Sequence, residues 1–264
     1  MSEAGEGAAF IFTRMIDLSI GLFHEPAHEP IKPSIAYLSH EVGAEWIETS
    51  FGATRADLVR SGGLGPAAEE VTATTHAGTH VDAPWHYAPV AEGAPARTID
   101  ELPLEWFFSD GVVLDVRSKG AGERIEIADL EAALARIDYA LKPLDIVMLM
   151  TGRDRFLFGP EYFQQPGLTR ESTLWLVEQG VKVIGIDAYS LDRSFEDIAE
   201  EFRATGNGDL IWEAHFAGIE REYCQIEKLA NLDRIPRPSG FKVACFPIKV
   251  HRGSAGWCRP VAFV

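Results

Sequence analysis

Short apolar runs alternate with stretches of helical spacing through the middle of the chain. Three apolar runs, Gly111–Val116, Asp145–Met150 and Val181–Ile186, predict buried strands. Apolar residues that recur every three or four positions over Ile127–Ile137 and Glu171–Glu178 predict helices that bury one face. Strands that alternate with helices predict an α/β domain with at least part of its sheet parallel.

Local signals predict where one of these helices ends and where a further helix begins. Gly180 follows the second helical pattern and is expected to stop it, because glycine readily adopts the left-handed conformation of a helix C-terminus. Ser194 and Asp197 have the spacing of a capping box, which predicts a further helix that runs through Phe202.

The flanks of this core have a more strand-like composition. We expect strands at Met15–Leu22, Trp46–Thr54, Glu70–Thr75, Phe241–Val250 and Val261–Val264. No internal repeat or long linker divides the chain, so we interpret residues 1–264 as one domain, with 1–9 as a loose tail.

The segment Phe23–Ser39 contains three prolines and two histidines, His24 and His28. Its composition predicts an irregular surface arm, and histidines in such an arm are expected to be solvent-exposed rather than functional.

Composition narrows the classes of partner and compartment. The 264 residues carry a formal net charge of -16, which disfavours nucleic acid and anionic membranes as partners. No apolar run approaches the roughly 20 residues that a membrane-spanning helix needs. Three cysteines without metal-type spacing are typical of free thiols, so we expect a soluble protein of the reducing cytoplasm.

Chemistry-bearing residues concentrate in Thr75–Tyr87, which contains three of the eight histidines. His76 and His80 are four residues apart, so one helical turn or a tight loop would direct both to the same side. Asp82 follows two residues later, and imidazole with carboxylate is a ligand set that zinc, manganese, iron and cobalt accept.

Three protein ligands leave coordination positions open for water, as in catalytic sites. His86, four residues after Asp82, has the spacing of a neighbour that exchanges protons with a metal-activated water instead of ligating the metal. The alternative interpretation is a histidine-rich loop that satisfies its own hydrogen bonds.

A second polar cluster occurs over residues 211–229. His215 and Glu227 are twelve residues apart, with Glu213, Glu220 and Glu222 between or beside them. Taken alone, His215 is typical of a packed helix histidine and Glu227 of a solvated carboxylate.

The run His76-Ala-Gly-Thr-His80-Val-Asp82-Ala-Pro-Trp-His86 resembles the signature H-x-G-T-H-x-D-x-P-x-H of the cyclase-like metal hydrolases. That family includes bacterial kynurenine formamidases and isatin hydrolases. Similar family patterns occur along most of the chain, at Ile16–Ser19, Gly185–Asp192, Glu227–Asp233 and Gly253–Ala262.

The resemblance implies a layered β/β/α core of the swivelling type with mixed sheet. It implies a metal site at His76, His80 and Asp82, in which the aspartate also reaches a second ion held by His215 and Glu227. One or two zinc or manganese ions per chain are expected. The isatin hydrolases have an amide at the position of Glu227, so this carboxylate favours a formamidase-like site, and the family implies a homodimer or tetramer.

The chain departs from compact formamidases by extra length between residues 17 and 71 and between 191 and 211, and we expect these insertions to border the pocket. Trp85, Tyr87, Trp212 and Trp257 are candidate walls for a planar substrate, with core packing as the alternative.

The sequence therefore predicts a metal-dependent hydrolase that cleaves an amide-type C–N bond in an aryl formamide, such as N-formylkynurenine, or in a cyclic amide. Two alternatives stay open: a lactone or ester hydrolase that uses the same site, and a family member that binds metal without catalysis.

Overall fold

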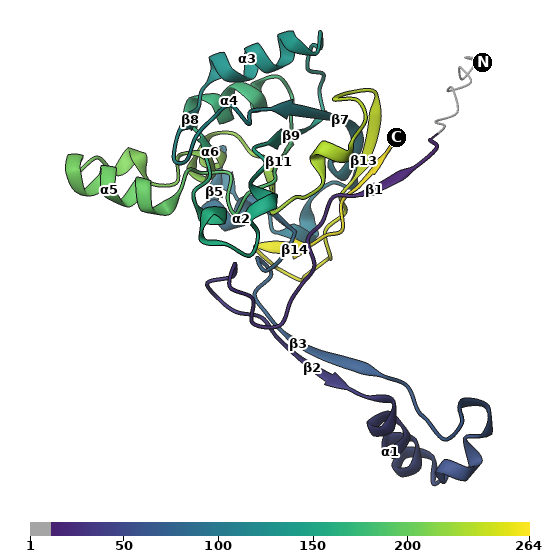
Figure 1. Cartoon of the computed structure of the whole chain (residues 1–264). Coiled ribbons are helices and arrows are strands. Elements are labelled where there is room, and N and C mark those ends of the chain that lie inside the picture. Colours follow the sequence, from purple (N-terminus) through teal and green to yellow (C-terminus); the bar gives the residue numbers. More distant parts are fainter. Residues whose placement is uncertain (1–11) are drawn as a thin grey trace.

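The computed structural model describes residues 12–264, so the tail predicted for residues 1–9 lies outside the described residues. A nine-stranded mixed sheet forms the body of the molecule (Figure 1). Its strands, in spatial order, are β1 (Met15–Asp17), β15 (Val261–Phe263), β13 (Phe241–Ala244), β7 (Phe108–Asp115), β9 (Ile146–Met150), β11 (Val183–Ile186), β12 (Cys224–Glu227), β4 (His80–Asp82) and β14 (Ala255–Trp257).

Parallel pairing is confined to the centre of the sheet. Strands β7, β9, β11 and β12 run parallel to one another, and antiparallel strands flank them on both sides. The α/β class and the mixed sheet predicted from the sequence are confirmed. Strands from both ends of the chain share this one sheet, and the single domain stays a prediction.

Three two-stranded sheets and the helices complete the structure. The small sheets pair β2 (Ser34–Leu38) with β3 (Ala68–Thr72), β5 (Val90–Ala91) with β6 (Ala94–Pro95), and β8 (Arg124–Ile125) with β10 (Gly167–Leu168). The α-helices are α1 (His40–Phe51), α2 (Pro84–Tyr87), α3 (Ile127–Arg136), α4 (Arg170–Glu178), α5 (Phe195–Thr205) and α6 (Glu213–Glu220). Single 3-10 turns occur at Arg55–Asp57, Val59–Ser61, Ile99–Glu101, Leu104–Phe107, Arg153–Phe156, Pro160–Phe163, Gly208–Leu210 and Leu232–Arg234.

The central strands are apolar at successive positions because both faces of the sheet are covered. On β7, Val112 and Leu114 face one core cluster together with residues of α3 and α4, whereas Val113 faces a second cluster. This alternation explains why the sequence shows continuous apolar runs here instead of alternating polar and apolar residues.

The predicted helices of the core begin and end close to the expected residues. Helix α4 is followed by Gly180 at φ +89°, and Ser194 accepts a hydrogen bond from the backbone N–H of Asp197 at the start of α5. The strand predictions for the flanks were longer than the strands themselves. Only Met15–Asp17, Phe241–Ala244 and Val261–Phe263 pair in the sheet, and the predicted strand at Glu70–Thr75 corresponds to β3, Ala68–Thr72.

The strand expected at Trp46–Thr54 was wrong, because most of this segment belongs to helix α1. Good helix formers such as Ala44 and Glu48 outweigh the strand preference of Ile47. Gly52, at φ +66°, ends the helix by donating its N–H to the carbonyl oxygen of Glu48.

The segment Phe23–Ser39 is less irregular and less exposed than its composition predicts. Ser34–Leu38 forms a strand, and His28 is only 2% exposed, with its ring edge-on to Phe158 and Tyr162. His24 is exposed as expected. Apolar rings from a distant segment cover His28, a tertiary contact that local composition does not encode.

Strands β2 and β3 with α1 form an arm that extends away from the body (Figure 1). We use the name arm for residues 34–72. The outer part of the first insertion therefore lies away from the metal-ligand motif, contrary to the expectation that it borders a pocket.

No helix in residues 12–264 combines the length and apolar character needed to cross a bilayer. Cys224, Cys245 and Cys258 are free thiols, as the spacing predicts. The cytoplasmic location stays a prediction.

Candidate metal centre

The motif residues come together because a turn, a strand and a short helix follow one another. His80 and Asp82 lie on β4 and point to the same side, while Val81 between them enters the core. His76 lies in the preceding turn, where Gly78 adopts φ +62°. His86 lies on α2, the short helix that follows β4.

Strand register brings Glu227 beside this motif. In the antiparallel pair of β4 and β12, His80 lies opposite Glu227. His80 Nε2 is 3.6 Å from Glu227 Oε2, and His215 Nε2 on α6 is 3.8 Å from Glu227 Oε1. The structure therefore assembles His76, His80, Asp82, His215 and Glu227, the five residues predicted as ligands.

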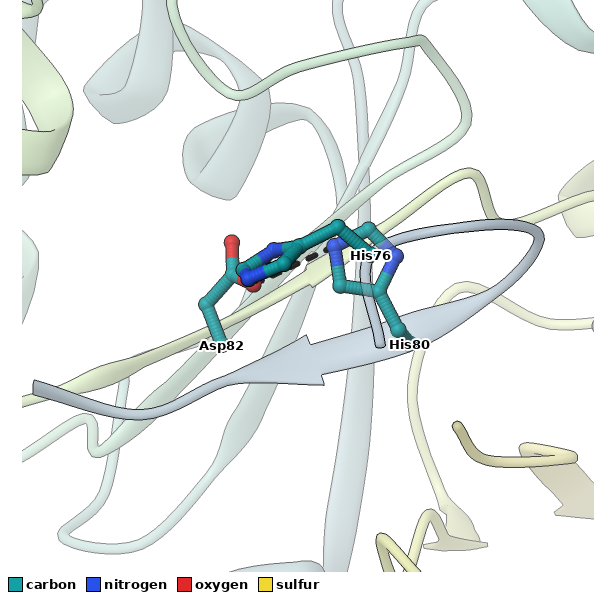
Figure 2. A group of neighbouring side chains, drawn as sticks. All are labelled: His76, His80 and Asp82. Carbon is teal, nitrogen blue, oxygen red and sulfur yellow. Dashed lines mark ion pairs between the residues drawn. The ribbon is translucent and has the colours of Figure 1, made fainter. Parts of the chain in front are cut away.

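Asp82 lies at the centre of the cluster. Its Oδ1 atom is 2.8 Å from His76 Nδ1 and 3.1 Å from His80 Nε2, and Figure 2 shows the three side chains pointing toward one another. Within residues 12–264, two groups have the spacing to hold a metal ion: His76, His80 and Asp82, and Asp82, His86 and His215. Asp82 belongs to both groups.

Hydrogen bonds outside the cluster orient two of the imidazoles. His80 Nδ1 is 2.9 Å from the carbonyl oxygen of Gly78, which makes Nδ1 the protonated nitrogen and leaves Nε2 free to bind a cation. His215 Nδ1 is hydrogen-bonded to Asp192 Oδ2 in the same way. Asp192 also accepts the N–H of Ala214, so one carboxylate holds both the start of α6 and the ring of His215.

Several buried atoms at the centre have no hydrogen-bond partner among residues 12–264. They are His80 Nε2 and both carboxylate oxygens of Asp82. Asp82 Oδ1 lies close to two imidazole nitrogens, but neither carboxylate oxygen makes a well-aligned hydrogen bond to a described residue, and a buried carboxylate without such bonds is costly. A divalent cation bound to these atoms satisfies them, so the donor set fits a metal site.

The charge distribution also fits a cation site. Burial alone raises the pKa of Asp82, but the imidazoles of His80 and His76 outweigh burial and hold that pKa well below its usual value. Burial and the charge of Asp82 raise the pKa of Glu227. Two close carboxylates repel each other when both are ionised, and a divalent cation between them removes this penalty.

His86 has the opposite environment to His215. Burial and the neighbouring imidazoles lower the pKa of His86 to about 4, although Asp82 opposes the shift. Burial also disfavours the charged form of His215, but Asp192 prevails and raises its pKa to about 9. At neutral pH the metal-free site therefore contains a neutral His86, able to accept a proton, beside a protonated His215.

The aromatic candidates separate into different environments. Trp212 stacks on His215 with ring centroids 4.6 Å apart, and its ring is 5.9 Å from His86. Tyr87 is buried, with ring contacts to His215 and Tyr223, and its role as a pocket wall stays a prediction.

No ring contact to the histidines of the centre is seen for Trp85 or Trp257 within residues 12–264, in contrast to Trp212. The Trp85 side chain is 44% exposed, and the Trp257 indole donates to the carbonyl oxygen of Thr74. Phe195, which the sequence reading did not select, contacts Trp212 at a centroid distance of 6.2 Å. The second insertion, which contributes Phe195, therefore lies next to the centre.

The other glutamates of the second cluster lie in ion pairs with arginines. Glu213 pairs with Arg124, Glu220 with Arg170, and Glu222 with Arg97. Local sequence does not distinguish them from Glu227, because β4 is the element that selects the ligand.

A model of the Cyclase family, described as "Putative cyclase", matches residues 16–193. The chain belongs to the cyclase family. The kynurenine formamidase of Erythrobacter litoralis (strain HTCC2594) is 30% identical over 191 residues, which cover 72% of this chain and 74% of that protein. Among solved structures, an isatin hydrolase bound to the product analogue thioisatinate has a TM-score of 0.71 at 19% identity, over 95% of this chain and 92% of that chain.

Isatin hydrolase A from Ralstonia solanacearum is similar to the same extent. Its TM-score is 0.71 at 21% identity, over 94% of this chain and 91% of that chain. These structural likenesses establish the shared fold. The family membership, the 30% identical kynurenine formamidase and the ligand cluster identify the chain as a metal-dependent hydrolase of the amide type.

Sequence reasoning assigned no role to Asp192 or Ser254. Ser254 Oγ is 3.0 Å from His76 Nε2, and Asp192 orients His215. Asp192 occurs in a family-like segment, so a signal for it was present. Ser254 precedes β14, and only the pairing of β14 with β4 brings it near the motif.

Proposed function

We propose that this enzyme hydrolyses an aryl formamide, with N-formylkynurenine as the substrate to test first. The observation that carries the proposal is the position of Asp82, which is shared by two candidate ligand groups and has two buried oxygens without hydrogen-bond partners among the described residues. A carboxylate shared in this way is suited to bridge two divalent ions.

In this proposal His76, His80 and Asp82 hold one ion, and Asp82, His215 and Glu227 hold a second. Glu227 replaces His86 in the second group, because Glu227 Oε1 lies 3.8 Å from His215 Nε2 and His86 is assigned to proton transfer. The nitrogen and oxygen donors suit zinc and manganese equally. Glu227 supports the two-ion form, because a second negative charge helps to neutralise a second divalent cation. When bound, such ions polarise a carbonyl and lower the pKa of a coordinated water from about 16 toward about 7.

His86 is the proposed proton carrier. Its lowered pKa leaves the ring neutral at pH 7, so one ring nitrogen can accept a proton from the attacking water. As the oxygen of that water bonds to the formyl carbon and the C–N bond breaks, His86 returns the proton to the leaving nitrogen. The products are formate and an aryl amine.

Trp212 is the proposed wall for the aromatic part of the substrate. Its backbone lies at φ +53°, a conformation that bulky residues rarely adopt and that is concentrated at functional sites. This conformation accompanies a ring that lies close to both His86 and His215. A planar ring on the substrate would extend this aromatic stack.

The decisive experiment measures metal content and hydrolysis on the same preparation. Protein purified without chelator is expected to contain zinc or manganese and to release formate from N-formylkynurenine. Isatin and an aryl lactone are the comparison substrates. Turnover of isatin or the lactone with no turnover of the formamide would reject the formamidase assignment while leaving the hydrolase class intact.

We also propose that the chain assembles as a homo-oligomer through the arm. Trp46, Phe51 and Val59 are 57%, 72% and 80% exposed, and α1 buries only Gly43 and Ala44. Exposed apolar surface of this kind is typical of an interface. Analytical ultracentrifugation is expected to give a dimer or tetramer, and a monomer at micromolar concentration would contradict the proposal.

A further inference from the structure

A buried lysine directly follows the proposed ligand Glu227. Lys228 is 2% exposed and adopts φ +60°, so the chain turns sharply where β12 ends. Lysine is almost never fully buried unless its charge is paired. Its partner is Glu29, 4% exposed, which comes from the segment that leads into the arm.

The three donors of the Lys228 ammonium group match three acceptor atoms. Nζ lies 2.9 and 2.8 Å from the two carboxylate oxygens of Glu29 and 2.8 Å from the carbonyl oxygen of His76. Glu29 Oε1 also accepts the backbone N–H of Gly78 at 2.7 Å. The pair therefore holds the backbone at two positions within the turn that carries His76 and leads to His80.

The main chain of Lys228 holds the same turn. The hydroxyl of Thr79 donates to the carbonyl oxygen of Lys228 at 2.6 Å and accepts the N–H of Ile20 at 2.9 Å. The turn at residues 76–79 is thus fixed to the end of β12 through both the backbone and the side chain of one residue.

We propose that Glu29 and Lys228 form a positioning pair, which sets the spacing between the turn bearing His76 and the strand bearing Glu227 before a metal ion binds. The ligand roles of His76 and Glu227 rest on the proposed function. The pair touches neither substrate nor metal in this scheme, and it acts through the backbone of the ligand-bearing segments.

The chemistry of the pair agrees with positioning better than with simple stabilisation. Apolar side chains of the same volume would often stabilise a buried position at least as well, because burying two charges carries a large desolvation cost. An apolar pair, however, would leave the His76 carbonyl and the Gly78 N–H without these partners.

The test compares Lys228→Met, Glu29→Gln and the double variant Glu29→Leu/Lys228→Met with wild type. Leu130→Ala, on the buried face of α3, is the control for a loss of stability away from the centre. Each metal-free protein is titrated with Mn²⁺ by calorimetry, and the visible spectrum of its Co²⁺ form reports coordination geometry.

The three pair variants are expected to bind Mn²⁺ about 10- to 100-fold more weakly, the range for partners that orient metal ligands. Their Co²⁺ spectra are expected to change, whereas Leu130→Ala keeps wild-type affinity and spectrum. The double variant is decisive because it leaves no unpaired buried charge. Wild-type affinity in the double variant would overturn the positioning role.

A second readout tests the pair without metal. The exchange rate of the Gly78 amide in chelated protein, corrected for global stability, is expected to rise in Lys228→Met and in the double variant. If wild type binds no metal, the proposed function fails, but this exchange still reports on the pair. Unchanged Gly78 protection in both variants would overturn the positioning role by itself.

Discussion

The metal-ligand centre buries polar groups, whereas the arm exposes apolar ones, and each departs from the usual distribution in a folded protein. At the centre, His80 and Asp82 are fully buried and contribute polar atoms without hydrogen-bond partners among the described residues. On the arm, Trp46, Phe51 and Val59 expose large apolar side chains. Both arrangements cost free energy in an isolated chain. The buried polar atoms indicate a metal ion as the missing partner, and the exposed apolar side chains indicate a protein surface.

The difference lies in what supports each region. Two of the ligands, His80 and Asp82, lie on β4, which is paired on both sides by β12 and β14 within the large sheet, so their spacing is rigid. A two-stranded ribbon, β2 with β3, joins the arm to the body, and such a ribbon is marginally stable alone. At the tip of the arm, the backbone of α1 at Gly43 packs closely against the backbone at Gly65. A rigid frame suits catalysis, and a protruding apolar arm suits assembly.

The largest expected effect comes from Asp82→Ala. This substitution removes the carboxylate shared by both ligand groups, so we expect metal content and turnover to be lost together while the protein stays folded. Metal analysis, formate release and circular dichroism on one preparation measure all three. Full metal content in the variant would contradict the bridging role and weaken the contrast between the centre and the arm.

His86→Ala separates proton transfer from metal binding at the centre. We expect turnover to fall by about 10²- to 10⁴-fold with metal content unchanged, because a general acid–base residue contributes about that much. His86 also belongs to a group with metal-binding spacing, so the metal measurement is informative. Loss of metal would reassign His86 as a ligand.

Asp192→Asn tests the hydrogen bond that orients His215. We expect Mn²⁺ affinity to fall about 10- to 100-fold, as for other such partners of ligating histidines. Asn207, which accepts the N–H of Asp209 on the surface, provides the control Asn207→Ala with unchanged affinity. Equal Mn²⁺ affinities for both variants would show that Asp192 does not orient a metal ligand.

Wild type and Asp192→Asn also differ in the pH dependence that we expect for metal binding. The raised pKa of His215, about 9, means that the metal-free ring is protonated at pH 7 and must lose a proton before Nε2 binds a cation. Apparent Mn²⁺ affinity is therefore expected to rise with pH up to about 9. Asp192→Asn removes the group that raises this pKa, so calorimetry in buffers of different ionisation enthalpy should show less proton release at pH 7. Equal release from both proteins would refute the assignment.

The smallest effect on the centre is expected from the arm. Trp46→Glu/Phe51→Glu places charges on the exposed apolar face, so we expect smaller assemblies in ultracentrifugation with metal content per chain unchanged. Leu104→Glu, at an exposed position of the body, is the control. Persistence of the wild-type assembly in the double variant would show that the arm is not the interface.

The sequence predicted best the central strands, each of which is covered on both faces by apolar side chains. The runs around Val112, Val147 and Ile184 are apolar at several successive positions because both faces of the sheet are covered. Prediction failed for His28 because a distant segment, with Phe158 and Tyr162, covers it. Prediction failed for Trp46 for a local reason, because the strand-like pair Trp46-Ile47 lies among stronger helix formers.

The sequence alone determined the candidate ligands within one motif, because His76, His80, Asp82 and His86 lie close enough along the chain for a turn and a strand to bring them together. The tertiary structure decided which distant groups join them. The register of β4 with β12 selects Glu227 over neighbouring glutamates, and the approach of α6 brings in His215 with its partner Asp192. Pairing between strands far apart in sequence is a non-local property, so spacing and composition alone did not select His215 and Glu227, and only the family resemblance pointed to them.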